Sequence, residues 1–170
     1  MTIVCKTERL IIRHCRISDA EFFVRLLNEK AFIRYIADKN VRTIDDGINH
    51  INNGPISSYQ QYGFGLNIVT LKETNVPIGI CGLIKRDELD YPDLGYAFLS
   101  DFCGQGYAYE AANVVLQEEV AKHSLNVVLA VTLPDNLSSN RLLQKIGFKL
   151  TGTIELYGSQ NNLYAHNKND

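Results

Sequence analysis

Apolar residues near the start of the chain first follow a strand-like pattern and then recur with a helical period. Residues 9–13 (Arg-Leu-Ile-Ile-Arg) form a short β-type run that predicts the first strand. Ser18-Asp19-Ala20-Glu21 is typical of a capping box, and the helix that it predicts ends near Lys30. Thr43-Ile44-Asp45-Asp46 indicates a second helix start, and Gly54-Pro55 is expected to end that helix because proline cannot continue it.

The rest of the chain alternates between strand-like and helix-like patterns. Strands are expected at residues 65–71, 78–84, 94–99, 127–133 and 148–156, with a short additional one near 163–165. The first two flank a polar turn at 72–75 and should form a hairpin. A helical period begins at Ala108, and a shorter helix is expected after the turn Pro134-Asp135-Asn136, ending at Gly147.

The order of these elements predicts the fold class. A strand and two helices precede an antiparallel meander, and strand–helix–strand–helix–strand follows. This order predicts an α/β fold with a central, mostly antiparallel mixed sheet and helices on both faces. A length of 170 residues favours a single domain over residues 1–170.

Composition and charge narrow the class of protein further. Hydrophobic residues make up 45% of the chain and charged residues 21%, as in ordinary globular proteins. There is no apolar run of the ~18 residues that a membrane span needs and no signal-peptide layout, so we expect a cytoplasmic protein without a membrane partner. The net charge of −2 and the absence of a long basic run argue against nucleic acid as a partner.

Candidate metal ligands are scattered. The four cysteines include no C-x-x-C pair and the four histidines have no zinc-like spacing, so no metal is expected. The sequence leaves monomer and homodimer equally open as oligomeric states.

The most informative segment is a glycine-containing loop between a strand and a helix, Phe102 to Ala108, which we call the cradle. The first N–H groups of a helix have no partner within the helix, and its dipole is positive at that end. Gly104 and Gly106 would let a phosphate approach the backbone closely. A Walker loop is excluded by the missing lysine, and a dinucleotide fingerprint by Tyr109, where the third glycine would stand. A simple turn remains open as the alternative.

The motifs around the cradle resemble a known family. Gly95-Tyr96, followed by Gly104-Gln105-Gly106-Tyr107-Ala108-Tyr109-Glu110-Ala111, is similar to motif A of the GNAT superfamily of N-acetyltransferases, and closest to its ribosomal-protein (RimJ/RimL-like) branch. The segment from Asn136 to Phe148 resembles the second coenzyme motif of the family, and Thr7-Glu8-Arg9-Leu10 resembles its opening.

The resemblance implies a GNAT-like acyl-CoA N-acyltransferase fold and a reaction. Acetyl would pass directly from acetyl-CoA to a primary amine of a protein N-terminus or a small molecule, without a metal. The coenzyme would lie on Cys103, Gly104, Gln105, Gly106, Tyr107 and Ala108. A backbone N–H of Phe98 or Leu99 would stabilise the thioester oxygen, and this strand would splay from the strand at 127–133 to admit the pantetheine arm.

Roles for individual polar residues also come from the resemblance, and each has a structural alternative. Asn136 would bond the pantetheine arm, or cap a helix. Ser139 would protonate the leaving thiolate, or bond a backbone carbonyl. Asp93 or Glu88 would serve as the base through a water relay, whereas Asp93 could instead be a turn residue after Pro92.

Three features depart from the family pattern. Asp101 stands where the superfamily has Arg or Gln, and we expect its side chain to face solvent. Leu143 replaces a tyrosine that many members carry, and the last strand is expected to be short. Cys103 lacks a neighbouring base, so it is not expected to carry the acyl group. Leu143 and the unassigned general base leave a catalytically weak coenzyme A-binding module as the alternative function.

Overall fold

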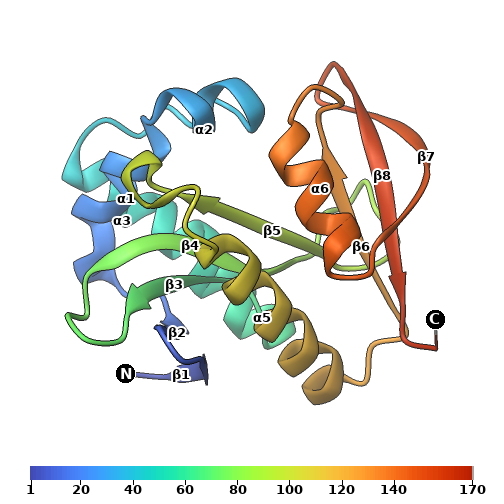
Figure 1. Cartoon of the computed structure of the whole chain (residues 1–170). Helices are drawn as coiled ribbons and strands as arrows, with labels where there is room; N and C mark the ends of the chain where they lie inside the picture. The colour runs from blue at the N-terminus through green and yellow to red at the C-terminus, as the bar shows by residue number, and fades with distance from the viewer. Residues whose placement is uncertain (170) are drawn as a thin grey trace.

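The computed structural model describes residues 1–169, and regular elements cover most of them (Figure 1). The strands are β1 (Ile3–Lys6), β2 (Leu10–His14), β3 (Leu66–Leu71), β4 (Pro77–Ile84), β5 (Asp93–Phe98), β6 (Val127–Thr132), β7 (Lys149–Leu156) and β8 (Ser159–Asn167). The helices are α1 (Ala20–Leu27), α2 (Lys30–Tyr35), α3 (Ile44–Ile51), α4 (Ser57–Tyr62), α5 (Tyr107–His123) and α6 (Leu137–Lys145).

The strands form one mixed sheet in the order β1-β2-β3-β4-β5-β6-β8-β7. Neighbouring strands are antiparallel, with the exception of β5 and β6, which run parallel. This pair is joined in register at a single position, Asp93 opposite Leu129. The predicted α/β class and the mostly antiparallel mixed sheet are confirmed.

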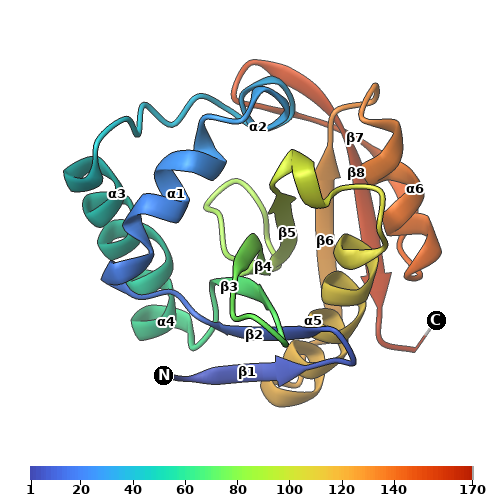
Figure 2. The same cartoon turned by 60° about the vertical axis from the view of Figure 1, so that its left-hand side comes forward.

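Helices cover both faces of the sheet, as the alternation along its strands requires. Ile68 and Ile80 belong to a core cluster with α1 and α3, whereas their neighbours Val69 and Cys81 belong to a second cluster with α5. Successive side chains on a strand point to opposite faces, so one strand supplies both clusters. Figure 2 shows α1, α3 and α4 on one side and α5 on the other.

The predicted end of the second helix at Gly54-Pro55 is wrong. Thr43 begins α3 as expected, because its hydroxyl accepts a hydrogen bond from the backbone N–H of Asp46 at 3.1 Å. The chain then passes through a π-helical turn, Asn52–Ile56, and continues as α4. The wider turn accommodates Pro55, which has no N–H to donate. The helical segment ends instead at Gly63, whose φ of +80° is a left-handed conformation that favours glycine.

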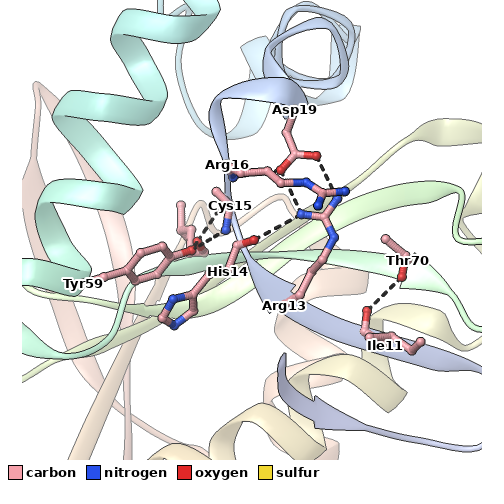
Figure 3. Close-up of polar contacts among 9 residues, drawn as sticks. Ile11, Arg13, His14, Cys15, Arg16, Asp19, Tyr59 and Thr70 are labelled. Carbon is pink, nitrogen blue, oxygen red and sulfur yellow. Dashed lines mark hydrogen bonds and ion pairs between the residues drawn. The ribbon is translucent and has the colours of Figure 1, made fainter. Parts of the chain in front are cut away.

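The predicted capping box of Ser18 and Glu21 is also wrong. Asp19 instead accepts a hydrogen bond from the backbone N–H of Arg16 at 2.9 Å, and its carboxylate forms a two-pronged ion pair with Arg13 at 2.8 and 2.9 Å (Figure 3). Both charged side chains are only 6% exposed. The first helix ends at Leu27 rather than near Lys30. A separate helix, α2, begins at Lys30.

A second group of contacts in Figure 3 holds α4 against the sheet. The hydroxyl of Tyr59 accepts a hydrogen bond from the N–H of Cys15 at 2.9 Å and donates to the carbonyl of Leu66. The ring of His14 stacks on the Tyr59 ring, with centroids 3.7 Å apart. These contacts fix the position of α4, whose residues Ser58 and Tyr62 line the cleft described below.

The two ends of the chain contribute more strand than the sequence predicts. β1 was not predicted, and it pairs with β2 at the edge of the sheet. β8 spans nine residues rather than the short strand expected near 163–165. Its polar sequence forms a strand because it pairs with β6 on one side and β7 on the other. Among residues 1–169, no helix has the length and apolar character to span a membrane.

Candidate active site

A cleft of about 1220 Å³ opens where β5 and β6 separate. The two strands diverge after their single pairing at Asp93 and Leu129, as Figure 1 shows. Residues of both strands line the cleft, together with the start of α5, the first turns of α6, and parts of α2 and α4. The splayed strands expected from the resemblance are therefore present and open into the cleft.

One end of the cleft is formed by the cradle. Gly104 and Gly106 have φ values of +77° and +85°, which favour glycine, and Gly106 directly precedes the first helical residue, Tyr107. Both glycines line the cleft, with Cys103, Tyr107 and Ala108. The N–H groups of the first turn of α5 have no partner within the helix, so this end of the cleft can bind an anion.

Two residues, Asp101 just before the cradle and Gln105 within it, do not line the cleft. The Asp101 side chain is 75% exposed and pairs with Arg25, so the expectation that it faces solvent is confirmed. Gln105 does not line the cleft: its side-chain amide donates to the carbonyl of Asp101 at 3.1 Å.

Cys103 does line the cleft, and partial burial raises the pKa of its thiol, which disfavours the thiolate.

The structure distinguishes the two candidate N–H donors, Phe98 at the end of β5 and Leu99 just after it. The N–H of Leu99 donates to the carbonyl of Ile78 on β4 at 2.9 Å. Because successive N–H groups of a strand point to opposite sides, the N–H of Phe98 points away from β4, toward the side where β6 diverges. Phe98 lines the cleft, whereas Leu99 is 1% exposed and packs in the core. The N–H of Phe98 is therefore the one available to a ligand.

Asn136 and Ser139 lie together at the start of α6 and both line the cleft. The side-chain oxygen of Asn136 accepts a hydrogen bond from the N–H of Ser139 at 3.5 Å, so the alternative prediction that Asn136 caps the helix is confirmed. The cap uses only the oxygen, and the amide NH₂ is not part of it. Asn136 can therefore cap the helix and still donate a hydrogen bond into the cleft.

Ser139 also contacts a residue that the sequence analysis did not assign to the site. Its hydroxyl lies 2.6 Å from the hydroxyl of Tyr96, which projects from β5. Burial raises the pKa of Tyr96 to about 12, so the phenol stays protonated at neutral pH. The signal in the sequence was the Gly95-Tyr96 pair, which marked the strand but not a polar partner 43 positions away.

Asp93 lies outside the cleft. It is fully buried at the start of β5, and both carboxylate oxygens accept hydrogen bonds from Arg86 at 2.9 Å. Burial raises the pKa of Asp93, and the guanidinium of Arg86 opposes that rise. This placement gives Asp93 a role in holding the strand that carries Tyr96. The other candidate base, Glu88, does line the cleft.

Much of the remaining cleft lining is aromatic and apolar. It includes Leu27, Phe32, Tyr35, Ile36, Pro55, Tyr62 and Tyr157. Charged side chains of the lining include Lys39 and Glu88, and the carboxylate of Glu88 accepts a hydrogen bond from Tyr157 at 3.3 Å. The cleft can therefore contact a molecule that combines a polar group with an apolar body.

The mixed sheet, the divergence of β5 from β6 and the glycine loop that begins α5 are the features of an acyl-CoA N-acyltransferase fold. The family model described as acetyltransferase (GNAT) domain matches residues 9–149, and the chain belongs to this family of acetyltransferases. The resemblance seen in the sequence is thereby confirmed.

Individual proteins agree with this assignment. The chain is 28% identical over 160 residues to the uncharacterized N-acetyltransferase YoaA of Bacillus subtilis, covering 93% of this chain and 89% of that protein. A GNAT-family acetyltransferase structure from Bacillus anthracis superimposes with a TM-score of 0.81 at 25% identity, covering 100% of both chains. RimL, the ribosomal L7/L12 α-N-protein acetyltransferase, shares the fold with a TM-score of 0.83 at 18% identity, covering 97% of both chains.

Proposed function

We propose that this acetyltransferase transfers the acetyl group of acetyl-CoA directly to a primary amine, either a protein N-terminus or a small-molecule amine. The observation that carries the proposal is one continuous cleft that is lined both by an anion-binding helix start and by aromatic and apolar side chains. A single cleft can hold both substrates at once, and orienting two reactants contributes up to ~7–11 kcal/mol to catalysis. RimL has been solved in complex with coenzyme A.

The cradle would bind the coenzyme pyrophosphate. Gly104 and Gly106 bring the backbone close to a phosphate without a Cβ, and the N–H groups at the start of α5 donate to its oxygens. The pantetheine arm would then extend between β5 and β6, and the amide NH₂ of Asn136, which lines the cleft, would bond it.

The reacting thioester would lie near Phe98 and Ser139. The N–H of Phe98 would donate to the thioester oxygen as negative charge develops there. When the amine nitrogen bonds to the carbonyl carbon and the carbon–sulfur bond breaks, the hydroxyl of Ser139 would give its proton to the leaving sulfur. Tyr96, 2.6 Å away, would replace that proton through their hydrogen bond and would regain its own proton from water.

The attacking amine must be neutral, and this requirement bears on the choice of acceptor. A terminal α-amino group has a pKa of about 7.7–8.0 and a lysine side chain about 10.4. A terminal amine therefore needs little assistance from a base, and Glu88, one of two carboxylates that line the cleft, would take its proton through water. Since Asp93 is held by Arg86, we propose Glu88 rather than Asp93 for this role.

The coenzyme site is tested by Gly106→Glu, which adds bulk and negative charge at the proposed pyrophosphate position. Acetyl-CoA at 100 times its dissociation constant should stabilise the wild type by ~2.7 kcal/mol and raise its melting temperature. We expect the shift to disappear in Gly106→Glu and to persist in Gly158→Glu, a matched change at another left-handed glycine with open space around it. A wild-type protein that shows no shift contradicts the assignment.

The reaction itself is tested by mixing the protein with acetyl-CoA and a panel of peptides, polyamines and aminoglycosides. Release of free thiol and a mass increase of the acceptor identify turnover and the acceptor class. Coenzyme binding without thiol release across the panel would favour the alternative function, a coenzyme A-binding module. Because acetyl-CoA must be present where the protein works, the proposal also supports a cytoplasmic location.

A further inference from the structure

Arg9 lies against the outer side of the cradle, on the turn between β1 and β2. Its guanidinium donates to the backbone carbonyl of Gln105 at 3.0 Å and to the carboxylate of Glu110 at 2.8 Å. The same group lies 4.2 Å from the centre of the Tyr107 ring, and a Cβ on Gly106 would meet it at 3.3 Å. One side chain thus contacts three residues across the loop and the first turn of α5, and lies beside Gly106.

Glu110 holds this arginine in place from the first turn of α5. Its second carboxylate oxygen accepts hydrogen bonds from the hydroxyl of Thr7 and from the backbone N–H of Arg9, the latter at 3.2 Å. The Thr7 hydroxyl in turn accepts from the N–H of Leu10 at 3.0 Å. Because the carboxylate is bonded to the β1–β2 turn at several points, the guanidinium has a defined position and orientation.

The contact between Arg9 and the Gln105 carbonyl determines the direction of the N–H group of Gly106. In a trans peptide the C=O and the N–H point in opposite directions, and there are no cis peptide bonds among the described residues. The carbonyl of Gln105 and the N–H of Gly106 belong to one peptide plane. With the carbonyl held toward Arg9, that N–H is directed away from Arg9, and Gly106 lines the cleft whereas Arg9 does not.

We propose that Arg9 is a positioning residue for the coenzyme: it holds the Gln105 carbonyl on the outer side of the cradle, so that the N–H of Gly106 stays directed at the pyrophosphate. The inference rests on the proposed coenzyme site. It also accounts for a cradle without a basic residue of its own, since Asp101 occupies the position where the superfamily has Arg or Gln and turns to solvent.

The direct test is the affinity for coenzyme A and for pantetheine, which lacks the pyrophosphate, measured by calorimetry. In Arg9→Gln we expect the Kd for coenzyme A to rise about tenfold, equivalent to about 1.4 kcal/mol, and the Kd for pantetheine to stay unchanged. Arg9→Lys should not restore the affinity, because an ammonium cannot bond the carbonyl and the carboxylate in the forked geometry of a guanidinium. Arg42→Gln removes an equal charge from an exposed pair with Asp38 and serves as the control.

A second measurement, by NMR, reports directly on the glycine amides of the cradle. Labelling with ¹⁵N-glycine gives twelve amide signals, one for each glycine. Coenzyme A should shift the Gly106 amide strongly in the wild type and in Arg42→Gln, and much less in Arg9→Gln. Glu110→Gln, which removes the charged anchor of Arg9, should resemble Arg9→Gln, and thermal unfolding of the free variants checks that each is folded.

The possible results separate this inference from the proposed function. If coenzyme A leaves the Gly104 and Gly106 signals of the wild type unmoved, the proposed coenzyme site is wrong, and the role of Arg9 fails with it. If those signals move in the wild type and Arg9→Gln keeps both the shift and the affinity, the coenzyme site stands and the role of Arg9 is refuted. Recovery of full affinity in Arg9→Lys would show that charge alone matters, which also overturns the proposal.

Discussion

At the scale of single residues, the chemistry of this acetyltransferase depends on hydrogen bonds between side chains that are distant in sequence. Ser139 lies at the start of α6 and Tyr96 on β5, and their hydroxyls meet at 2.6 Å. The two elements meet because one core cluster contains both Leu143 of α6 and Leu94 of β5. A proton leaving Ser139 has a nearby replacement, and the raised pKa of Tyr96 keeps that proton on the phenol at neutral pH.

We predict that Ser139→Ala lowers kcat by about 10²-fold, the lower end of the range for general acid catalysis. The KM for acetyl-CoA should change little, because the pyrophosphate and pantetheine contacts remain. Steady-state kinetics with an acceptor from the panel measures both values. Equal kcat in the variant and the wild type would assign Ser139 a purely structural role, and Ser138→Ala, a neighbouring serine of α6, is the matched control.

A local sequence pattern reveals the role of some site residues but not of others. The left-handed glycines of the cradle and the capping Asn136 were identified from short motifs, because the backbone geometry that they support is local. Tyr96 was not identified, since its partner lies 43 positions away. Asp93 was given a possible role in proton transfer because the sequence does not reveal that Arg86 occupies both of its oxygens.

At the scale of elements, polar contacts with the rest of the protein determine where α1 begins and how the α3–α4 segment continues. Gly54-Pro55 predicts a helix end, yet the π-helical turn carries the chain on to Gly63. Tyr59 is fixed by the backbone of Cys15 and Leu66, so the tertiary contacts of α4 outweigh the local preference for a break. Similarly, Asp19 pairs with Arg13 inside the protein, and the local capping pattern of Ser18 is not used.

The ion pair of Arg13 and Asp19 gives a stability prediction. Asp19→Ala leaves the guanidinium of Arg13 buried without its partner, and we expect the free energy of unfolding to fall by about 3–5 kcal/mol. Asp38→Ala breaks an exposed pair with Arg42 and should cost less than about 1 kcal/mol. Ser18→Ala should change the stability by no more than about 0.5 kcal/mol, because Ser18 caps nothing. Chemical denaturation measures all three, and similar values for Asp19→Ala and Asp38→Ala would refute the prediction.

At the scale of the whole molecule, the sheet consists of two antiparallel parts joined at one position. β1 to β5 form one part and β6, β8 and β7 the other, with Asp93 and Leu129 as the joining pair. The sequence predicts the order of strands along the chain and the mixed character of the sheet. The separation of β5 from β6 is expected only from the family resemblance, because both strands have ordinary apolar patterns of their own.

The separation of β5 from β6 predicts different rates of amide hydrogen exchange at Phe98 and Leu99. The N–H of Phe98 faces the cleft rather than a neighbouring strand, so we expect it to exchange faster than the N–H of Leu99, which is bonded to Ile78. Coenzyme A should slow exchange along the cleft side of β5 and β6 more than elsewhere in the sheet. Hydrogen exchange followed by mass spectrometry or NMR measures this, and uniform protection over the whole sheet would contradict it.

The single pairing between β5 and β6 would also give the coenzyme a structural role in the sheet. Pantetheine is an extended chain with amide groups of its own, and the facing edges of two strands offer it the donors and acceptors that a strand would normally use. Bound there, it would serve as an inserted strand made of something other than polypeptide. The architecture would then be complete only with its substrate in place, and each turnover would remove and restore one part of the fold.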